Sequence, residues 1–402
     1  MNKNLLTVFL MLFMGQALGD DLLTEISSLQ VHRLNATESA GITASLNINP
    51  LINRHSQVTM ALPNGQQIKI AHKSVDLNKL GGYSWQGHVM GDDTQKVTLS
   101  IYDDAIAGSI HTRDAVFEIQ PLGQNRIKLV ELKPQAFPEC DGGEPVPQPV
   151  ASTQLPLNNI TNNRATHTVD VIVVYTPEAR VGAGGHNGIK AIAQAAVDAM
   201  NSSLVNSVVD TEIVLLYAGE VNYNDSNSSS TDLNWLQAST EVEALKNQYG
   251  ADMAALLVDS MSGSCGRGYV MRNPGPGFRD YAVQVTRVSC AVGTLSFAHE
   301  FGHNMGLEHD PAHGALPDSA SYIWSFGHFH SGQYRTVMSY SNECSGGCTR
   351  RQYFSNPDVN YLGLATGIDN ERDNARTLDL TSPVSAAFRV RAPDLIFENG
   401  FD

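Results

Sequence analysis

H-E-F-G-H-N-M-G-L-E-H-D, from His299 to Asp310, is the stretch that decides what this chain folds into. His299 and His303 are four positions apart, so on a helix their side chains lie on one face, about one turn from each other. Glu300 projects about 100° round the same helix and reaches a water molecule held between the two imidazoles. The stretch therefore predicts a helix that binds a metal ion and carries a catalytic base.

The end of this stretch supplies a third ligand. Gly306 can take the positive φ that ends a helix, and His309 follows three residues later, where it can turn back toward the metal. Three histidines with an open fourth position are typical of a catalytic zinc site, so we expect one zinc ion bound by His299, His303 and His309. The alternative is a helix with exposed or core-capping histidines, but such a helix has no reason to end in Gly-x-x-His-Asp.

Length and composition limit the possible functions. The chain has 402 residues, which leaves room for two or three domains. Its residues are 42% hydrophobic and 17% charged, as in globular proteins, and no internal stretch is long and apolar enough to span a membrane. A net charge of −15 argues against nucleic acid or an anionic membrane as a partner. We expect protein or peptide substrates as partners, and a monomer.

The N-terminal residues resemble an export signal. Lys3 precedes a short apolar run at residues 5–14, and small residues at 17–19 offer a cleavage site. Residues 1–19 are therefore a predicted signal peptide, too short for a membrane anchor, and the protein is expected outside the cell or in transit through the periplasm. The alternative is an apolar first strand of the folded domain. Residues 392–402 are expected to form a C-terminal tail.

Residues 20–142 are expected to form a β-rich module. Segments rich in Val, Ile and Thr alternate in part with polar residues, and turn-forming residues separate them. The predicted strands lie at residues 57–62, 67–71, 96–102 and 115–120. This module contains no recognisable set of catalytic residues.

The β-rich module resembles the pro-domain of reprolysin-type metalloproteases. The resemblance lies in four short runs, at residues 87–89, 97–100, 107–110 and 117–122. It implies that the module assists the folding of the enzyme that follows and inhibits it. Four prolines between positions 145 and 156 then favour an extended, exposed backbone. Residues 143–165 are therefore expected to be a linker with the processing site.

Residues 166–391 are expected to form the catalytic module. A nearly continuous β-branched run at 169–175 predicts a strand that is covered on both faces. Helices are predicted at 188–205 and 231–249, and further strands at 211–217, 254–258 and 281–289. Strands that alternate with helices imply right-handed crossovers and a mainly parallel sheet with helices packed against it.

The zinc-binding stretch, together with T-V-M-S-Y at residues 336–340, resembles the metzincin clan of zinc proteases. Because Asp310 directly follows the third histidine, the stretch is similar to that of the reprolysin-like (adamalysin, M12B-like) branch of that clan. The resemblance implies an α/β catalytic domain with a twisted, mixed, mostly parallel sheet, a zinc helix and a Met-turn. Met338 matches the Met-turn methionine, which packs beneath the three histidines. Asp310 is expected to fix the loop or a ligand rather than to bind zinc.

Tyr340 departs from the adamalysin pattern and is typical of the astacin and serralysin branches. It can bind zinc in the resting enzyme or donate a hydrogen bond to the developing oxyanion. The alternative is a tyrosine that is merely packed near the site. Residues 353–357 resemble the segment that walls the pocket for the substrate side chain just after the cut bond.

The five cysteines fit an exported protein: Cys140, Cys265, Cys290, Cys344 and Cys348. The last four allow three pairings, of which we favour Cys265 with Cys290 and Cys344 with Cys348. Cys140 then remains unpaired, and a thiolate is a good zinc ligand. We hypothesise that Cys140 occupies the open zinc position in the precursor, as in the cysteine switch of related families, although their flanking motif is not reproduced. The alternative is a free or intermolecularly paired thiol.

These expectations combine into a secreted, zinc-dependent endopeptidase that is made as a latent precursor and inhibited by its own pro-domain. Glu300 accepts a proton from zinc-bound water as the water attacks the peptide carbonyl, and then returns the proton to the departing amine. Two alternatives are a binding or adhesion module on a metzincin fold and a zinc hydrolase of non-peptide amides. The intact ligands and base favour an enzyme, and the expected elongated cleft favours peptides. Calcium is possible but nothing indicates it.

Overall fold

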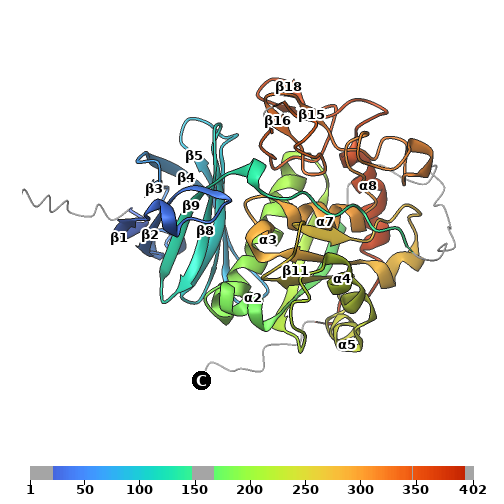
Figure 1. Ribbon diagram of the computed structural model, residues 1–402, viewed down its shortest axis with the longest axis horizontal. Coiled ribbons are helices and arrows are strands. Elements are labelled where there is room, and N and C mark those ends of the chain that lie inside the picture. The colour runs from blue at the N-terminus through green and yellow to red at the C-terminus, as the bar shows by residue number, and fades with distance from the viewer. Residues whose placement is uncertain (1–20, 147–166, 346, 394–402) are drawn as a thin grey trace, which may run out of the picture.

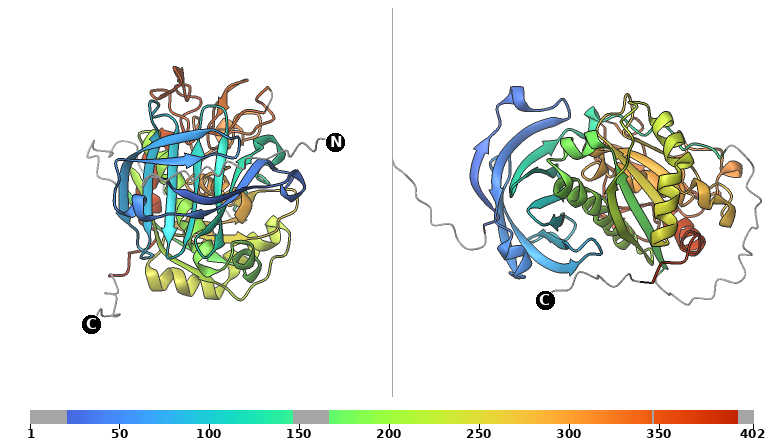
Figure 2. Two further views of the ribbon diagram at one scale, coloured as in Figure 1. Left: turned by 90° about the vertical axis from the view of Figure 1, so that its left-hand side faces the viewer. Right: turned by 90° about the horizontal axis from the view of Figure 1, so that it is seen from below.

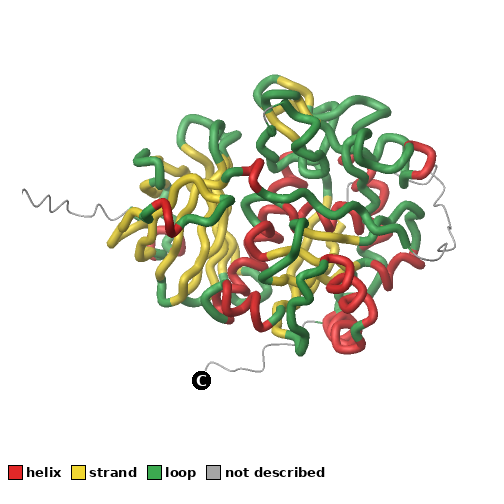
Figure 3. The backbone as a smooth tube through the Cα atoms, in the orientation of Figure 1, coloured by secondary structure: helices red, strands yellow, loops and turns green. Residues whose placement is uncertain are grey.

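The computed structural model describes residues 21–146, 167–345 and 347–393. The predicted signal peptide lies outside these ranges, as do most of the predicted linker and most of the predicted tail. Within the described ranges the chain forms two units that lie side by side, a β-sheet module and an α/β module (Figures 1 and 3). None of the helices in these ranges has the length and apolar character needed to cross a membrane.

The N-terminal unit is one antiparallel sheet of nine strands in the order β1-β2-β9-β8-β7-β6-β5-β4-β3. Its strands are β1 Leu23–Ser28, β2 Glu38–Leu46, β3 Gln57–Ala61, β4 Gln67–Leu77, β5 Tyr83–Val89, β6 Lys96–Tyr102, β7 Ala105–His111, β8 Val116–Gly123 and β9 Arg126–Leu132. From β3 to β9, strands that follow each other in the chain are also neighbours in the sheet, because short turns reverse the chain between them. The predicted strand at 96–102 coincides with β6, and the other three predicted strands overlap β3, β4 and β8.

One face of this sheet packs on its own apolar core, in which the largest fully buried side chain is Trp85. The other face contacts the α/β unit through small residues of β7, and Ala105 and Ala107 belong to that unit's hydrophobic core. Every residue of β7 is buried. A strand covered on both faces loses the usual apolar–polar alternation, which accounts for the uniform burial of β7.

The second unit contains a five-stranded sheet in the order β11-β10-β12-β14-β13. Its strands are β10 His167–Tyr175, β11 Thr211–Glu220, β12 Met253–Val258, β13 Gly266–Gly268 and β14 Val283–Arg287. The pairs β10–β11, β10–β12 and β12–β14 are parallel, whereas β13 runs antiparallel to β14 at the edge. The sheet is therefore mixed and mostly parallel, as the alternation of strands and helices predicts.

Helix α3 (His186–Asn206) lies between the two sheets, and the nine-stranded sheet curves around it (Figure 2). Its buried residues lie on all sides of the helix, because both sheets cover it. Alanines at its surface let the strands approach closely. Polar contacts add to this interface: Ser100 of β6 donates a hydrogen bond to Asp198, and Ser202 lies within hydrogen-bond distance of Thr98.

The single helix predicted at 231–249 is wrong in one respect, because two helices occupy this region. They are α4 (Ser229–Ala238) and α5 (Thr240–Tyr249). Between them Ser239 has an extended backbone, with φ −71° and ψ 115°, and its hydroxyl accepts a hydrogen bond from the N–H of Val242. A serine that caps the next helix is a typical helix start, and here this cap divides the predicted helix.

The remaining helices are short, apart from the last one, which lies at the C-terminal end of the α/β unit (the catalytic unit below). They are α1 Asn49–Ile52, α2 Pro177–Gly182, α6 Val288–Ala291, α7 Ser296–Asn304 and α8 Asn374–Ser385, with two-stranded sheets formed by β15 Phe329–His330 with β16 Tyr334–Arg335 and by β17 Asn360–Tyr361 with β18 Leu364–Ala365. Two disulfides join Cys265 to Cys290 and Cys344 to Cys348, the pairing favoured from the sequence. Cys140 is a free thiol.

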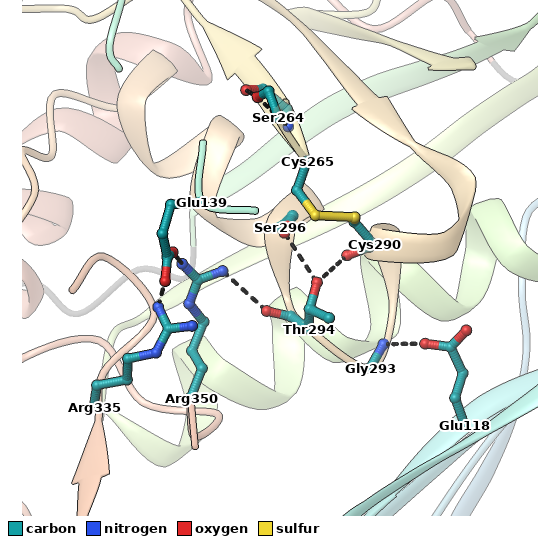
Figure 4. The surroundings of a disulfide bond; sticks show 11 residues. Glu118, Glu139, Ser264, Cys265, Cys290, Gly293, Thr294, Ser296, Arg335 and Arg350 are labelled. Carbon is teal, nitrogen blue, oxygen red and sulfur yellow. Dashed lines mark hydrogen bonds and ion pairs between the residues drawn. A yellow bond between two sulfur atoms is a disulfide. The ribbon is translucent and has the colours of Figure 1, made fainter. Parts of the chain in front are cut away.

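A buried carboxyl group joins the two units near the start of α7. Glu118 of β8 is 4% exposed and accepts a hydrogen bond of 2.7 Å from the backbone N–H of Gly293 (Figure 4). Burial raises the pKa of Glu118 to about 7, and the hydrogen bond from Gly293 opposes this rise only in part. The folded state therefore holds a proton on Glu118 more tightly than the unfolded state does.

Stability should accordingly fall as the pH rises. The contribution of Glu118 is fully present below pH 4.5, the usual pKa of a glutamate, and is lost as the pH rises through about 7. Glu118→Gln keeps an acceptor for Gly293 but cannot ionise. Between pH 5 and pH 8 the wild-type free energy of unfolding should drop by up to about 3 kcal/mol more than that of the variant, measured by denaturant titration. Equal pH dependence of the wild type, Glu118→Gln and the control Glu131→Gln would contradict this.

Candidate metal centre

Helix α7 carries the first half of the zinc-binding stretch. It begins at Ser296, directly after Leu295, whose left-handed backbone with φ 61° cannot continue a helix. His299, Glu300 and His303 are all completely buried. After Met305 the backbone of Gly306 takes a φ of +89°, which ends the helix as the sequence predicts.

The turn at Gly306 brings the third histidine back to the first two. His309 Nε2 lies 3.0 Å from His303 Nε2 and 3.1 Å from His299 Nε2. A tetrahedral zinc ion with Zn–N bonds of about 2.0–2.1 Å holds its nitrogen ligands roughly 3.3 Å apart. The three imidazoles thus converge at nearly the spacing that one zinc ion requires.

Backbone carbonyls fix the orientation of all three rings. Nδ1 of His299 lies 2.8 Å from the carbonyl oxygen of Val337. Nδ1 of His303 lies 2.8 Å from that of Leu307, and Nδ1 of His309 lies 3.2 Å from that of His313. Each Nδ1 therefore carries the proton and donates it, which leaves three Nε2 lone pairs facing one another. Converging lone pairs repel each other unless a cation lies between them, so the residues fit a bound metal ion.

Burial keeps the imidazoles of His299 and His309 neutral. It lowers the pKa of His309 to about 4 and, with Arg350 as the next cause, lowers the pKa of His299 well below its usual value. A neutral imidazole is the form that binds a metal.

Met338 packs against α7, the helix that carries His299 and His303. It is completely buried, and a Cβ added to Gly302 of α7 would lie 2.6 Å from its sulfur atom. Glycine at position 302 thus makes room for the methionine. The preceding residue supplies the carbonyl that orients His299, so the turn around Met338 both supports and aligns the metal site.

Asp310 connects the metal-binding loop to that turn. Its Oδ2 accepts hydrogen bonds from the backbone N–H of Tyr340 at 2.9 Å and from the Ser339 hydroxyl at 3.3 Å. Its Oδ1 accepts one from the N–H of Ala312 at 3.2 Å and lies 2.9 Å from His313 Nδ1. Asp310 is completely buried and does not face the converging Nε2 atoms as a ligand, since its oxygens are occupied by these four groups.

Glu300 has a buried carboxyl group with no hydrogen-bond partner in the described part of the chain. Burial, followed by the charge of Cys140, raises the pKa of Glu300 well above its usual value. The carboxyl group packs on Gly266 of β13, where an added Cβ would lie 2.7 Å from Oε1. The site therefore contains a proton acceptor of raised pKa that no other group in the described ranges engages.

The fourth position of the histidine cluster is filled by the thiol of Cys140. Its Sγ lies 3.0 Å from Nε2 of His309, 3.1 Å from that of His299 and 3.8 Å from that of His303. The four ligand atoms lie within 4.8 Å of one another and form an N₃S set, which suits zinc. Tyr340 closes the site: its hydroxyl lies 3.1 Å from the Cys140 sulfur and donates to the Cys140 carbonyl at 2.9 Å.

Residues 139–146, which we call the pro-segment, lie along the free edge of β13. The N–H of Cys265 donates to the Glu139 carbonyl at 3.2 Å, and that of Asp141 donates to the Gly266 carbonyl at 3.1 Å. Further along, the N–H of Glu144 donates to Gly268 at 2.8 Å. The edge of β13 therefore accepts an extended chain across the metal centre, and the pro-segment occupies that edge.

The sequence did not reveal two arginines beside the site. Burial disfavours a charge on Glu139, but Arg335 and Arg350 together lower the pKa of this glutamate to about 2. In the segment 353–357, which is expected to wall a substrate pocket, Phe354 is completely buried in the hydrophobic core. Nothing in the local pattern marks Arg335 or Arg350, because their contact with Glu139 joins positions about 200 residues apart.

Comparison with known proteins is consistent with this geometry. Residues 165–355 match the model of the family described as "Metallo-peptidase family M12". A "Peptidyl-Asp metalloendopeptidase" of Stenotrophomonas maltophilia is 27% identical over 390 residues, covering 89% of this chain and 89% of the relative. One of Xanthomonas campestris is 28% identical over 352 residues, covering 81% of this chain and 80% of the relative.

A solved structure, the metalloproteinase-II of Bacteroides fragilis, matches with a TM-score of 0.41 and 12% identity, covering 69% of this chain and 89% of the other. At this level the likeness supports no argument about the site.

The contacts of Asp310 make a prediction about metal affinity. Asp310→Asn replaces one acceptor oxygen by an NH₂ donor, which must face either the N–H of Tyr340 or that of Ala312. We expect the loop to loosen and the metal affinity to fall roughly 10–100-fold, the usual cost of changing a residue that orients metal ligands. Competition with a chelator of known affinity measures this. The exposed Asp318→Asn serves as the control, and equal affinities of the two variants would refute the role of Asp310.

Proposed function

Because the chain is a bacterial metalloendopeptidase of family M12, we propose that it is a secreted, zinc-dependent endopeptidase made as a latent precursor. The observation that carries this proposal is the convergence of three imidazole Nε2 atoms with the Cys140 thiol at their open position. The two disulfides suit the oxidising environment outside the cytoplasm and support secretion. The predicted signal peptide supports it too.

His299, His303 and His309 are the proposed zinc ligands, with Met338 beneath them. The backbone carbonyls that orient all three rings support this role. A bound zinc ion lowers the pKa of a water molecule in its open position to about 7 and polarises the peptide carbonyl.

Glu300 is the proposed general base and acid. Its carboxyl group lies on the same helix as two of the ligands and has no competing protein partner. It accepts a proton from the attacking water and then delivers that proton to the nitrogen of the departing amine. A pKa raised by burial suits a group that must hold the proton between these two steps.

Tyr340 is proposed to donate a hydrogen bond to the oxygen that gains negative charge during the attack. Its hydroxyl lies at the open position, within hydrogen-bond distance of the Cys140 sulfur. Burial, followed by the charge of Cys140, raises the pKa of Tyr340, so the hydroxyl keeps its proton and remains a donor.

Substrates are proposed to bind as extended peptides along the edge of β13. The pro-segment already forms backbone hydrogen bonds with this edge, which supports the assignment. The relatives from Stenotrophomonas and Xanthomonas bear the name peptidyl-Asp metalloendopeptidase, and we propose that this chain also cleaves next to aspartate.

Latency is proposed to arise from the pro-segment. Its Cys140 occupies the position where the attacking water must stand, and its backbone occupies the edge where the substrate must bind. The nine-stranded sheet holds the segment in place through its contacts with α3. Removal of the pro-segment by cleavage in the predicted linker then opens both positions.

Glu300→Ala tests the catalytic base. The variant should keep one equivalent of zinc, because Glu300 is not a ligand, and should lose peptidase activity by at least about 100-fold, the lower range for general acid–base catalysis. Metal analysis and a peptide-cleavage assay measure the two quantities. Glu212→Ala, an exposed glutamate on β11, is the control. Retained activity in Glu300→Ala, at full metal content, would reject this mechanism.

The thiol of Cys140 allows latency to be tested without an activity assay. In the metal-loaded precursor we expect slow alkylation of Cys140, and at least a tenfold faster reaction once a chelator removes the metal. The other four cysteines are in disulfides, so the label reports Cys140 alone. In parallel, unprocessed Cys140→Ser precursor should cleave a short peptide faster than unprocessed wild type. The proposal that the Cys140 thiol inhibits the precursor would be excluded by two results together: an alkylation rate that is the same with and without metal, and an unprocessed Cys140→Ser precursor that cleaves the peptide no faster than wild type.

A further inference from the structure

Two buried arginines meet at Glu139, the residue before Cys140 (Figure 4). The side chains of Arg335 and Arg350 are each 5% exposed. Glu139 Oε2 lies 3.1 Å from Nη1 of Arg335 and 3.1 Å from Nη2 of Arg350. Its other oxygen accepts a hydrogen bond of 2.9 Å from the N–H of Ser341. One carboxylate of the pro-segment thus bridges two buried guanidinium groups.

The catalytic unit itself holds both arginines in place. Arg335 donates hydrogen bonds to the carbonyl oxygens of Ser339 at 2.6 Å and of Cys348 at 3.1 Å. Arg350 donates to the carbonyl oxygen of Thr294 at 3.0 Å. All three carbonyls belong to the catalytic unit. The two guanidinium groups therefore keep their orientation when the pro-segment leaves.

Departure of the pro-segment removes their counter-ion. Within residues 21–146, 167–345 and 347–393, Glu139 is the only carboxylate that forms an ion pair with Arg335 or Arg350. In addition, the buried Nε of Arg350 has no hydrogen-bond partner there. Two buried charges of the same sign without a counter-ion are costly. The emptied position therefore favours the binding of another carboxylate.

The position of Glu139 indicates where that carboxylate comes from. Glu139 is bonded to Cys140, whose sulfur lies at the metal centre, and consecutive Cα atoms are about 3.8 Å apart. The carbonyl of Glu139 is paired with Cys265, directly before β13, and the N–H of Asp141 with Gly266 of β13. A substrate strand on the same edge, with its cleaved bond at the metal, places one flanking side chain between the two arginines.

The residue on the other side of Cys140 meets a different environment. Asp141 lies 2.8 Å from Nη1 of Arg267, but the side chains are 49% and 20% exposed. Arg267 also pairs with Glu144 at 2.7 Å. Exposed ion pairs contribute little to binding. The buried arginine pair lies on one side of the metal centre only.

We propose that Arg335 and Arg350 form the specificity pocket for an acidic side chain that flanks the cleaved bond, and that Glu139 fills this pocket in the precursor as an internal substrate mimic. The inference rests on the proposed endopeptidase function and gives its preference for aspartate a physical basis. Because a glutamate bridges the two arginines in the precursor, glutamyl substrates enter the same pocket.

The test uses the processed, metal-loaded enzyme and matched peptides with Asp, Glu, Asn or Gln on either side of the cut. Wild type should show a kcat/KM at least about 100-fold higher for Asp than for Asn, on one side of the cut. In Arg350→Gln this ratio should fall roughly 10–100-fold, the effect of losing one hydrogen bond between charged groups. The loss should come from the Asp peptide, with the Asn peptide changed less than about threefold.

Two arginine variants serve as controls. Arg279→Gln removes an exposed arginine that pairs with Asp280, and its Asp-to-Asn ratio should equal that of wild type. Arg267→Gln tests the other neighbour of the metal centre, and we expect a ratio within about twofold of wild type. Loss of the preference in Arg267→Gln, with the preference intact in Arg350→Gln, would overturn the assignment.

A binding measurement provides a second readout that needs no turnover. Labelled Asp and Asn peptides are titrated into Glu300→Ala enzyme, with and without Arg350→Gln, and fluorescence anisotropy reports the affinities. The Asp peptide should bind at least tenfold more tightly than the Asn peptide, and Arg350→Gln should abolish the difference. Equal affinities for both peptides without the arginine substitution would contradict the pocket.

The possible failures are distinguishable. If wild type with bound metal cleaves no peptide, the proposed endopeptidase function fails, and the binding measurement still decides whether the arginines select an acid. If wild type cleaves peptides without preferring an acid, the pocket is wrong and the endopeptidase function stands. If Arg350→Gln does not fold, the four-peptide comparison in wild type decides, because equal rates for Asp and Asn would overturn the proposal.

Discussion

The convergence of three imidazole Nε2 atoms on one point is the constraint on which the rest of the catalytic unit depends. Such lone pairs face one another only when the Nδ1 atoms are held by acceptors, and the carbonyls of Val337, Leu307 and His313 supply them. Those carbonyls come from the turn around Met338, the end of α7 and the loop after it. Asp310 ties two of these segments together through its four hydrogen bonds. The geometry of the site is thus a property of three backbone segments rather than of one helix.

The same geometry connects the proposed catalysis with the proposed inhibition. We propose that a peptide substrate binds at the edge of β13 and at the open position of the histidine cluster, and the pro-segment occupies both. The nine-stranded sheet covers α3, and the chain that leaves the sheet crosses the metal centre directly. The buried arginine pair is a third shared element, because Glu139 occupies the position that we assign to an acidic side chain of the substrate. Under this proposal, inhibition and specificity depend on the same guanidinium donors.

Much of this could be predicted from sequence because it depends on short-range patterns. The spacing of His299, His303, Gly306 and His309 predicts the helix and the turn that follows it, and the β-branched run at 169–175 predicts the interior strand β10. Other features depend on distant contacts. Strand β13 is three residues long with glycine at both ends, so no strand pattern marks it. Arg335 and Arg350 look like ordinary charged residues until the fold brings Glu139 between them. The division between α4 and α5 was missed because a single serine cap sets it.

Metal-edge X-ray absorption on the purified precursor tests the central claim most directly. The account predicts zinc at one equivalent per chain, with three nitrogen ligands at about 2.0–2.1 Å and one sulfur ligand at about 2.3 Å. After removal of the pro-segment, the sulfur scatterer should be replaced by oxygen at about 2.0 Å while the three nitrogens remain. A precursor that binds no stoichiometric metal, or binds it without a sulfur ligand, would contradict the account of how Cys140 and the three histidines form one centre.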